Sequence, residues 1–225
     1  MSAPRNVRES NLYPIVEKWA AKHFGFFKTG INVGLSYSRV DVLGVRDIGG
    51  NLSGEVETIA IEVKRGTQPF ATASGQALGY EVYANRVYLA DVRETEFRPS
   101  EIEIASHLGI GLIRIHGSKC REVLSSPYHH PISRMSLELV ERMGLGRCQM
   151  CGTTFEIGTK ANRWLKVSRK SLPCALEKGK GFVFWNFELA RRKRTVSDRP
   201  TNHGTSTFRR YICPDCVSSV FCPKE

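Results

Sequence analysis

Three short patterns in the first part of the chain combine residue types that can do chemistry. Asp41 lies in an apolar stretch, Glu62 and Lys64 stand two positions apart in another, and Gln76 precedes Tyr80 by four positions. Alternation along a strand puts Glu62 and Lys64 on one face of a sheet, and a helix puts Gln76 and Tyr80 on one face. An acid held beside a base on a rigid strand suits catalysis.

These residue types match the needs of phosphodiester hydrolysis. A hard divalent cation binds oxygen ligands, which the carboxylates of Asp41 and Glu62 and the backbone carbonyl of Val63 can supply. Lys64 can position the attacking water or stabilise the negative charge that builds up on the phosphate. We therefore expect Mg²⁺ or Mn²⁺ between Asp41 and Glu62.

The pattern resembles the PD-(D/E)XK nuclease superfamily, and Gln76-x3-Tyr80 is similar to the Q-x3-Y signature of its RecB-like branch. The resemblance covers the first half of the chain. It implies a restriction-endonuclease-like core that cleaves DNA, with Gln76 orienting the site and Tyr80 packing or bonding beside it. Many relatives carry a further glutamate on the first helix. Glu17 is the candidate here, and a solvated surface glutamate is the alternative.

Other interpretations compete with a nuclease. Glu62 and Lys64 could be polar residues of an edge strand that faces water. The fold could be a degenerate nuclease scaffold of a non-catalytic DNA-binding or regulatory protein, or a zinc-stapled module that binds an acidic protein. Asp41 and Glu62 argue for a working site, because a retired site has no chemical reason to keep carboxylates that repel each other.

The elements that must position these residues form an α/β domain with a mixed central sheet flanked by helices. Their predicted order is α, β, β, β, α, β, α, β. In chain order we expect a helix capped by Ser10, strands within 26–37, around Asp41 and around Glu62, the Gln76 helix, a strand at 87–90, a helix from Pro99 and a last strand at 110–115. Glycines at 49–50 and the segment 51–54 supply the turn between the second and third strands.

A second candidate site consists of two C-x2-C pairs, Cys148 with Cys151 and Cys213 with Cys216. Four thiolates can bind one metal ion tetrahedrally, and Zn²⁺ is the expected occupant. The alternative is an iron–sulfur cluster, which some RecB-like nucleases hold with one cysteine ahead of the core, but no cysteine precedes Cys120 here. The long separation of the pairs predicts a zinc ribbon with a large insertion.

Three cysteines remain outside this set. We interpret them as small buried residues: Cys120, Cys174 and Cys222. Cys222 also lies close enough to Cys216 to serve as a substitute ligand. A disulfide framework is not expected, since seven cysteines cannot all pair and no signal peptide precedes the chain.

Charge divides the chain sharply. Residues 1–120 hold 14 Lys and Arg against 13 Asp and Glu, whereas residues 121–225 hold 19 against 9. The insertion interleaves cations with aromatics, and we interpret its cations as phosphate contacts and the aromatic run at 182–187 as a core strand. The cations include Arg163, Lys166, Arg169, Lys170, Lys178, Lys180 and the run Arg191-Arg192-Lys193-Arg194.

The expected organisation is a nuclease-like domain at 1–125, a linker with a short helix at 126–146, and a small zinc-bound C-terminal domain at 147–225. No apolar run approaches membrane-spanning length. We therefore expect a cytoplasmic Mg-dependent phosphodiesterase whose partner is DNA, with endonuclease and exonuclease action both open and a homodimer left open.

Overall fold

The structure, a computed structural model, describes residues 8–35, 38–50, 54–148, 150–156, 182–185, 209–212 and 216. It divides into two compact units. The first unit comprises Met1–Ile48 with Val56–Met143, and the second comprises Gly49–Glu55 with Gly144–Glu225. None of the helices among the described residues is long and apolar enough to cross a membrane.

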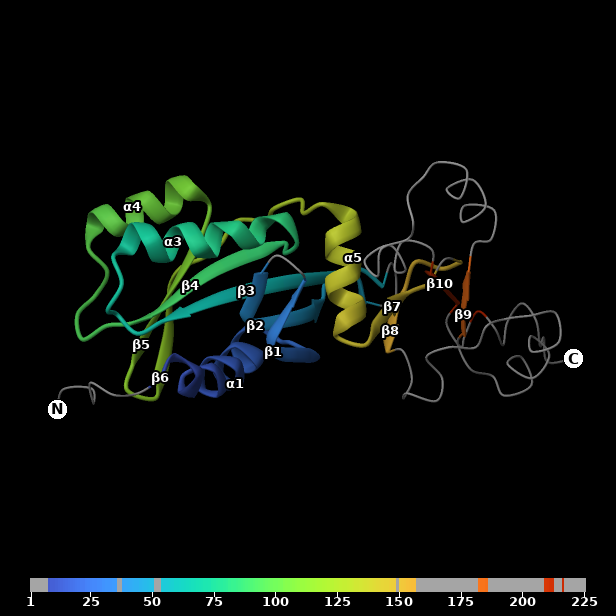
Figure 1. The fold of residues 1–225 in the computed structure, drawn as a ribbon, viewed down its shortest axis with the longest axis horizontal. Coiled ribbons are helices and arrows are strands. Elements are labelled where there is room, and N and C mark those ends of the chain that lie inside the picture. The colour runs from blue at the N-terminus through green and yellow to red at the C-terminus, as the bar shows by residue number, and fades with distance from the viewer. Residues whose placement is uncertain are drawn as a thin grey trace, which may run out of the picture. The chain divides into compact units, whose positions relative to one another are not determined.

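A six-stranded mixed sheet forms the centre of the first unit (Figure 1). Its strands, in sheet order, are β1 Lys28–Leu35, β2 Ser38–Asp47, β3 Val56–Lys64, β4 Arg86–Val92, β5 Gly111–His116 and β6 Lys119–Leu124. The β3–β4 and β4–β5 pairs are parallel, and the other neighbours are antiparallel. The predicted mixed central sheet flanked by helices is confirmed.

Helices cover both faces of this sheet, with α3 and α4 together on one side and α1 on the other in Figure 1. The helical elements are η1 Glu9–Asn11, α1 Tyr13–Phe24, α3 Phe70–Leu78, η2 Gly79–Val82, α4 Pro99–Leu108 and α5 Ser133–Arg142. Burial from both sides explains why β3 and β4 are almost continuously buried instead of alternating between buried and exposed residues.

Side chains that alternate along β3 place its core residues on one face of the sheet and its candidate catalytic residues on the other. Ile59, Ile61 and Val63 belong to the hydrophobic cluster that packs against Val16 and Ala20 of α1. The residues between them therefore point to the opposite face, where α3 lies. This places Glu62 and Lys64 together on the α3 side of the sheet, as the sequence predicts.

The start of α1 differs from the prediction. Ser10 lies within η1 and caps nothing, because α1 begins at Tyr13 after Leu12, with Pro14 in its first turn. The backbone N–H of Leu12 already donates to the Glu9 carbonyl in the 3₁₀ turn, 2.9 Å away. A backbone carbonyl, and not the serine side chain that the sequence predicts, thus accepts the N–H at the start of the helix.

The predicted last strand of the sheet is not the last. Gly117, with a φ of +60°, permits a tight turn after β5, and β6 then pairs antiparallel with it. The segment predicted as a linker, 126–146, is also tied to the first unit. The hydroxyl of Ser126 accepts from the Val87 N–H at 3.0 Å, and α5 buries Leu139 and Val140. After this segment the chain enters the second unit at Gly144.

Two short hairpins form the described part of the second unit. β7 Leu145–Arg147 pairs antiparallel with β8 Thr154–Glu156, and β9 Phe182–Trp185 pairs antiparallel with β10 Arg209–Ile212. Of the core strand expected at 182–187, the part at Phe182–Trp185 forms a strand, β9, and residues 186–187 lie outside the described residues. The following predicted residues lie outside the described residues: 51–53, Cys174, Cys213, Cys222, the cations between Arg163 and Lys180, and the run from Arg191 to Arg194.

Candidate active site

Asp41 lies where the ladder on both sides of β2 is interrupted. On one side the β2–β3 pairing ends at Val42 opposite Ile61, so Asp41 has no strand partner there. On the other side the β1–β2 pairing skips Asn32, whose φ is +54°. The carboxylate of Asp41 occupies the opened gap and accepts the Val63 N–H at 2.9 Å. A side chain thus satisfies a backbone group that the ladder leaves unpaired.

Glu62 is the centre of the candidate site. Its Oε1 lies 2.5 Å from Lys64 Nζ, and its Oε2 accepts from the Tyr80 hydroxyl. The Tyr80 hydroxyl also lies 2.7 Å from the Arg39 carbonyl oxygen. Tyr80 thereby joins β2 to β3 just where these strands separate. Glu62, Lys64 and Tyr80 are each 4% exposed.

The carboxyl of Asp41 resists ionisation. Burial above all, and then the negative charge of Glu62, raise the pKa of Asp41 from 3.8 to about 6, although the Val63 N–H, the Tyr13 hydroxyl and Lys64 act in the opposite direction. Tyr13, on α1, has its own pKa raised by burial and by its hydrogen bond to Asp41. A buried carboxyl beside a second carboxylate therefore ionises less readily than an exposed one.

Lys64 remains a cation. Burial by itself lowers the pKa of Lys64, but the hydrogen bond and charge of Glu62, with help from Glu9 and Asp41, outweigh burial and raise it. A lysine with a raised pKa is protonated at neutral pH and cannot accept a proton as a general base. We expect Lys64 either to position the attacking water or to stabilise negative charge. Both roles use the protonated side chain.

The glutamate that reaches the site is one that the sequence analysis missed. Glu9 Oε1 lies 3.5 Å from Lys64 Nζ. Glu17, the sequence candidate, is half-buried on α1, and it makes no ion pair with the site among the described residues. A spacing of four residues joins Glu9, Tyr13 and Glu17 along the chain. That spacing could have directed attention to Glu9 and Tyr13, both of which contact the site.

Gln76 and Tyr80 do not share one helix face. The α-helix ends at Leu78, and Tyr80 lies in the following turn η2. Gln76 is exposed, whereas Tyr80 is buried against Glu62. Because α3 buries Ala73 and Ala77 instead, the expected i, i+4 face is wrong. The expectation that Tyr80 bonds beside the site agrees with its hydrogen bond to Glu62.

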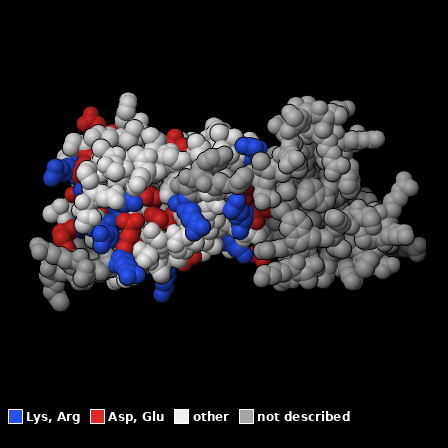
Figure 2. Space-filling model, in the orientation of Figure 1, with Lys and Arg blue, Asp and Glu red and all other residues white. Residues whose placement is uncertain are grey.

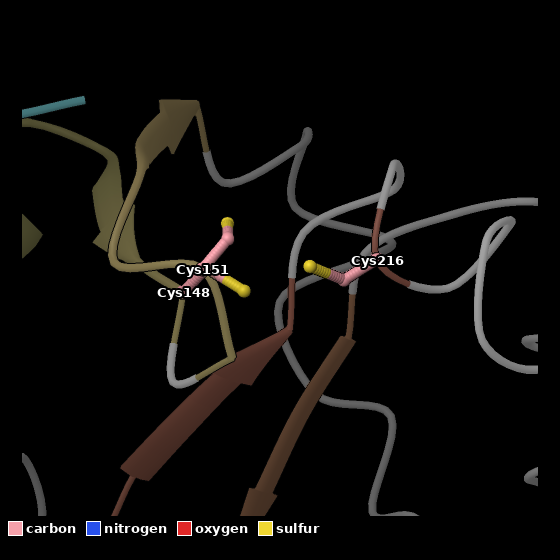
Figure 3. Close-up of side chains that lie close together, drawn as sticks. All are labelled: Cys148, Cys151 and Cys216. Atoms are coloured by element: carbon pink, nitrogen blue, oxygen red, sulfur yellow. The ribbon is translucent and has the colours of Figure 1, made fainter. Parts of the chain in front are cut away.

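Three of the four predicted metal-binding cysteines gather in the second unit. The Sγ atoms of Cys148, Cys151 and Cys216 all lie within 4.8 Å of one another. Figure 3 shows the Cys216 sulfur pointing toward the turn that carries the other two. Cys213, the fourth, lies outside the described residues.

Backbone hydrogen bonds close the turn between β7 and β8 that carries Cys148 and Cys151. The Cys148 N–H donates to the Thr153 carbonyl at 2.9 Å, and the Gly152 N–H donates to the Cys148 carbonyl at 3.0 Å. Gly152 adopts a φ of +77°, which the glycine after the second cysteine permits. Hydrogen bonds from Thr153 above all, and from Cys148 and Cys216, lower the pKa of Cys151 to about 6, so this thiol readily ionises to a thiolate, the form that can bind a metal ion.

Charge is balanced over the described residues. Figure 2 shows acidic and basic side chains intermingled on the face that it presents. This agrees with the near-equal counts of the two signs in residues 1–120.

No protein-family model matches the chain, and no curated protein matches it. Among solved structures the chain is similar to a protein of unknown function from Silicibacter pomeroyi. The two are 19% identical, with a TM-score of 0.43 over 61% of this chain and 85% of the other. The function must therefore come from the chemistry of the two sites.

Proposed function

We propose that the chain is a metal-dependent nuclease that hydrolyses DNA phosphodiester bonds, built on a restriction-endonuclease-like core with a zinc-bound basic module. The observation that carries this proposal is the convergence of Asp41, Glu62 and Lys64 at the interrupted ladder of β2. Asp41 is 8% exposed, and Glu62 and Lys64 are each 4% exposed. Two carboxylates and a lysine held this close serve electrostatic catalysis better than stability, because burying charge is costly.

The donor set fits a hard divalent cation. Asp41 and Glu62 offer carboxylate oxygens, and the raised pKa of Asp41 reflects burial first and then the nearby negative charge of Glu62. Val63 holds Asp41 in place through its N–H, and its carbonyl is the third proposed ligand. A bound Mg²⁺ or Mn²⁺ would supply a more acidic water and neutralise phosphate charge.

The protein's own groups then have separate roles. Lys64 remains protonated and stabilises the negative charge that develops on the phosphate. Tyr80 fixes Glu62 by its hydroxyl, and Tyr13 does the same for Asp41. Glu9 shares Lys64 with Glu62 and so helps to set where the ammonium group lies. Gln76, exposed on α3, is proposed to contact the substrate from outside this set.

The second unit is proposed to bind Zn²⁺ through Cys148, Cys151, Cys213 and Cys216 and to hold the DNA. Three of these thiols already gather within 4.8 Å. The surplus of cations, 19 against 9 in residues 121–225, supports electrostatic attraction to phosphates.

The rival function is non-catalytic DNA binding on the same fold. In its favour, Glu62 and Lys64 satisfy each other within the protein, as a purely structural pair would. Incubating the full chain with circular and linear DNA and Mg²⁺ separates the two. Cleavage that disappears in Glu62→Gln supports the nuclease, and binding without cleavage at any Mg²⁺ or Mn²⁺ concentration overturns it.

A further inference from the structure

We infer that Asp91, at the end of β4, is a positioning residue that fixes Lys64 for catalysis. The inference rests on the proposed nuclease function and adds a residue that acts through Lys64. In the parallel pairing of β3 with β4, Lys64 lies directly opposite Asp91. Opposite residues on neighbouring strands point to the same face, so Asp91 shares the face of Glu62 and Lys64.

Asp91 holds the turn that follows Lys64. Its Oδ1 accepts the Gly66 N–H at 2.7 Å, and Asp91 is 3% exposed. The turn approaches β4 very closely, since a Cβ on Gly66 would lie 2.2 Å from the Val92 carbonyl oxygen. The φ of Gly66, +75°, is also one that glycine adopts without strain.

The hydrogen bond from Gly66 to Asp91 matters because the turn is not held by burial. Residues 65–69 are all exposed, so burial does not fix the chain between Lys64 and α3. The path of the backbone just after Lys64 decides where its long side chain starts. A catalytic ammonium group must be placed to within about an ångström, and a misplacement of about 1 Å can cost about a hundredfold in rate.

Asp91 is itself held rigidly. Its Oδ2 accepts from Arg93 Nε at 2.9 Å. The two other guanidinium nitrogens of Arg93 bind Glu101 of α4 at 2.7 and 3.0 Å, and the guanidinium lies 4.2 Å from the centroid of the Phe97 ring. Because both oxygens of Asp91 are engaged by the protein's own donors, Asp91 acts on the position of Lys64 and not on the substrate.

Glu57 provides a matched control on the same strand as Lys64. It is 1% exposed and lies between two arginines, with Arg86 Nε 2.7 Å from its Oε1 and Arg46 on its Oε2. Glu57 and Asp91 are thus both buried carboxylates bound to arginine. Glu57 lies near the start of β3, seven residues before Lys64, and among the described residues it makes no hydrogen bond or ion pair with the turn at Gly66.

The experiment compares four variants of the full chain: Asp91→Asn, Asp91→Leu, Gly66→Ala and Glu57→Gln. Steady-state cleavage of DNA with Mg²⁺ gives kcat and KM, and hydrogen exchange reports the Gly66 amide. Asparagine keeps an oxygen for Gly66 but loses the charge, whereas leucine keeps the size and loses the acceptor. Alanine at Gly66 displaces the turn and leaves Asp91, Arg93 and Glu101 intact.

We expect Asp91→Leu and Gly66→Ala to lower kcat by about tenfold or more, with KM unchanged. Asp91→Asn should retain kcat within about threefold, because Gly66 keeps its acceptor. Exchange of the amide at residue 66 should accelerate in Asp91→Leu and in Gly66→Ala, and it should stay slow in Asp91→Asn. Glu57→Gln should lower the stability of the fold. It should keep the wild-type kcat, and exchange of its Gly66 amide should remain as slow as in the wild type.

Wild-type kcat in Asp91→Leu, or an equal loss in Glu57→Gln, would overturn the role of Asp91. So would an Asp91→Asn variant as slow as Asp91→Leu, because the charge pair with Arg93 would then matter more than the tie to Gly66. A wild-type chain that cleaves nothing overturns the nuclease proposal instead. Gly66 exchange that does not differ between Asp91→Leu and wild type overturns the tie with or without cleavage.

Discussion

The two units build their sites in opposite ways. In the first unit the site is built on a hydrogen-bonded sheet. The β2–β3 ladder is interrupted there, and Asp41, Glu62 and Tyr80 fill the gap. In the second unit the described elements are two short hairpins, and the cysteines come together at a turn and at residue 216. The first site depends on a fold that exists without it. The proposed zinc site would make the second fold depend on its site.

Because of this difference, the two proposed metal ions would have different effects on the fold. A divalent cation in the first unit would act on charge already placed by a hydrophobic core, so its removal leaves the fold intact. A zinc ion in the second unit would supply folding energy itself, because such small modules have little core. The predictions below test this contrast, starting from the largest expected effect.

Removal of zinc should unfold the second unit and spare the first. Zinc binding in small modules contributes on the order of 10 kcal/mol of folding free energy. Cys148→Ser, or a chelator, should therefore abolish protection from hydrogen exchange at β7 and β8 and leave β3 and β4 protected. Metal analysis should find one zinc per wild-type chain. Absence of zinc, or the visible absorption of an iron–sulfur cluster, contradicts this prediction.

Neutralising Glu62 should abolish cleavage without weakening DNA binding. Glu62→Gln keeps an oxygen for the Tyr80 hydroxyl but loses the charge that pairs with Lys64 and would bind the cation. We expect a rate loss of about a thousandfold or more, since charge stabilisation of this kind is worth several kcal/mol. Affinity should stay equal or rise, because a charge that repels phosphate is lost.

Glu57→Gln is the matched control for that experiment, as it removes a buried carboxylate from the same strand. Its rate should equal that of the wild type after correction for any unfolded fraction. Equal loss in the two variants would mean that Glu62 acts through stability alone, and the comparison of a preformed site with a metal-built one would fail.

The grip on DNA should reside in the second unit. Changing Arg191, Arg192, Lys193 and Arg194 to glutamine should weaken binding by about tenfold or more and reduce the salt dependence by about 0.9 per lost contact on a logarithmic plot. The control changes four exposed cations of the first unit to glutamine: Lys18, Lys22, Arg98 and Lys119. Both variants lose the same net charge. If titrations at several salt concentrations find equal effects, the first unit contributes as much as the second.

The sequence predicts the strand chemistry well because period-two patterns are local. Glu62 and Lys64 share a face, and β3 has the predicted position, since apolar residues at 59, 61 and 63 must face one core. The glycines at 30 and 34 did not prevent β1 from forming, because pairing with β2 compensates for their weak strand preference. Local pattern was enough for elements that tertiary packing also favours.

What the sequence could not predict depends on long-range contacts. Glu9 reaches Lys64 only because η1 precedes α1 at the site, and Tyr80 leaves the helix of Gln76 because α3 stops at Leu78. Nor does any local signal show that Asp41 replaces a ladder partner of Val63. Spacing identified the participants on the strands, and the fold determined which neighbours they meet.

Stability should depend on pH through Asp41. Its folded-state pKa, about 6, lies above its ordinary value of 3.8, so ionisation costs the folded state more than the unfolded one. The contribution of Asp41 is full below about pH 4 and is lost as the pH rises through 6. Asp41→Asn cannot ionise and keeps an oxygen for the Val63 N–H. Its advantage over the wild type should therefore grow across this window to about 3 kcal/mol.

Urea unfolding between pH 4 and 8 measures this gap. Added Mg²⁺ should narrow it at pH 8, because only the wild-type site gains a cation that offsets the repulsion between Asp41 and Glu62. A gap that stays constant over the whole pH range would show that Asp41 does not titrate as described. A gap that Mg²⁺ leaves unchanged would argue against a cation site here.

The smallest effect should come from the glutamates before and on α1, and it sharpens the description of the first site. Glu9 lies 3.5 Å from Lys64, and its side chain is 30% exposed, so solvent weakens the pair to about 0.2–1 kcal/mol. Glu9→Gln leaves Lys64 with less negative charge around it. We expect DNA binding without added divalent cation to tighten by up to about fivefold, measured by fluorescence anisotropy at low salt.

Glu17→Gln removes the same charge from α1 without touching Lys64, so it should change affinity less. An equal gain in both variants would mean that general charge, and not the ion pair with Lys64, sets the effect, and Glu9 would then lose its place in the site.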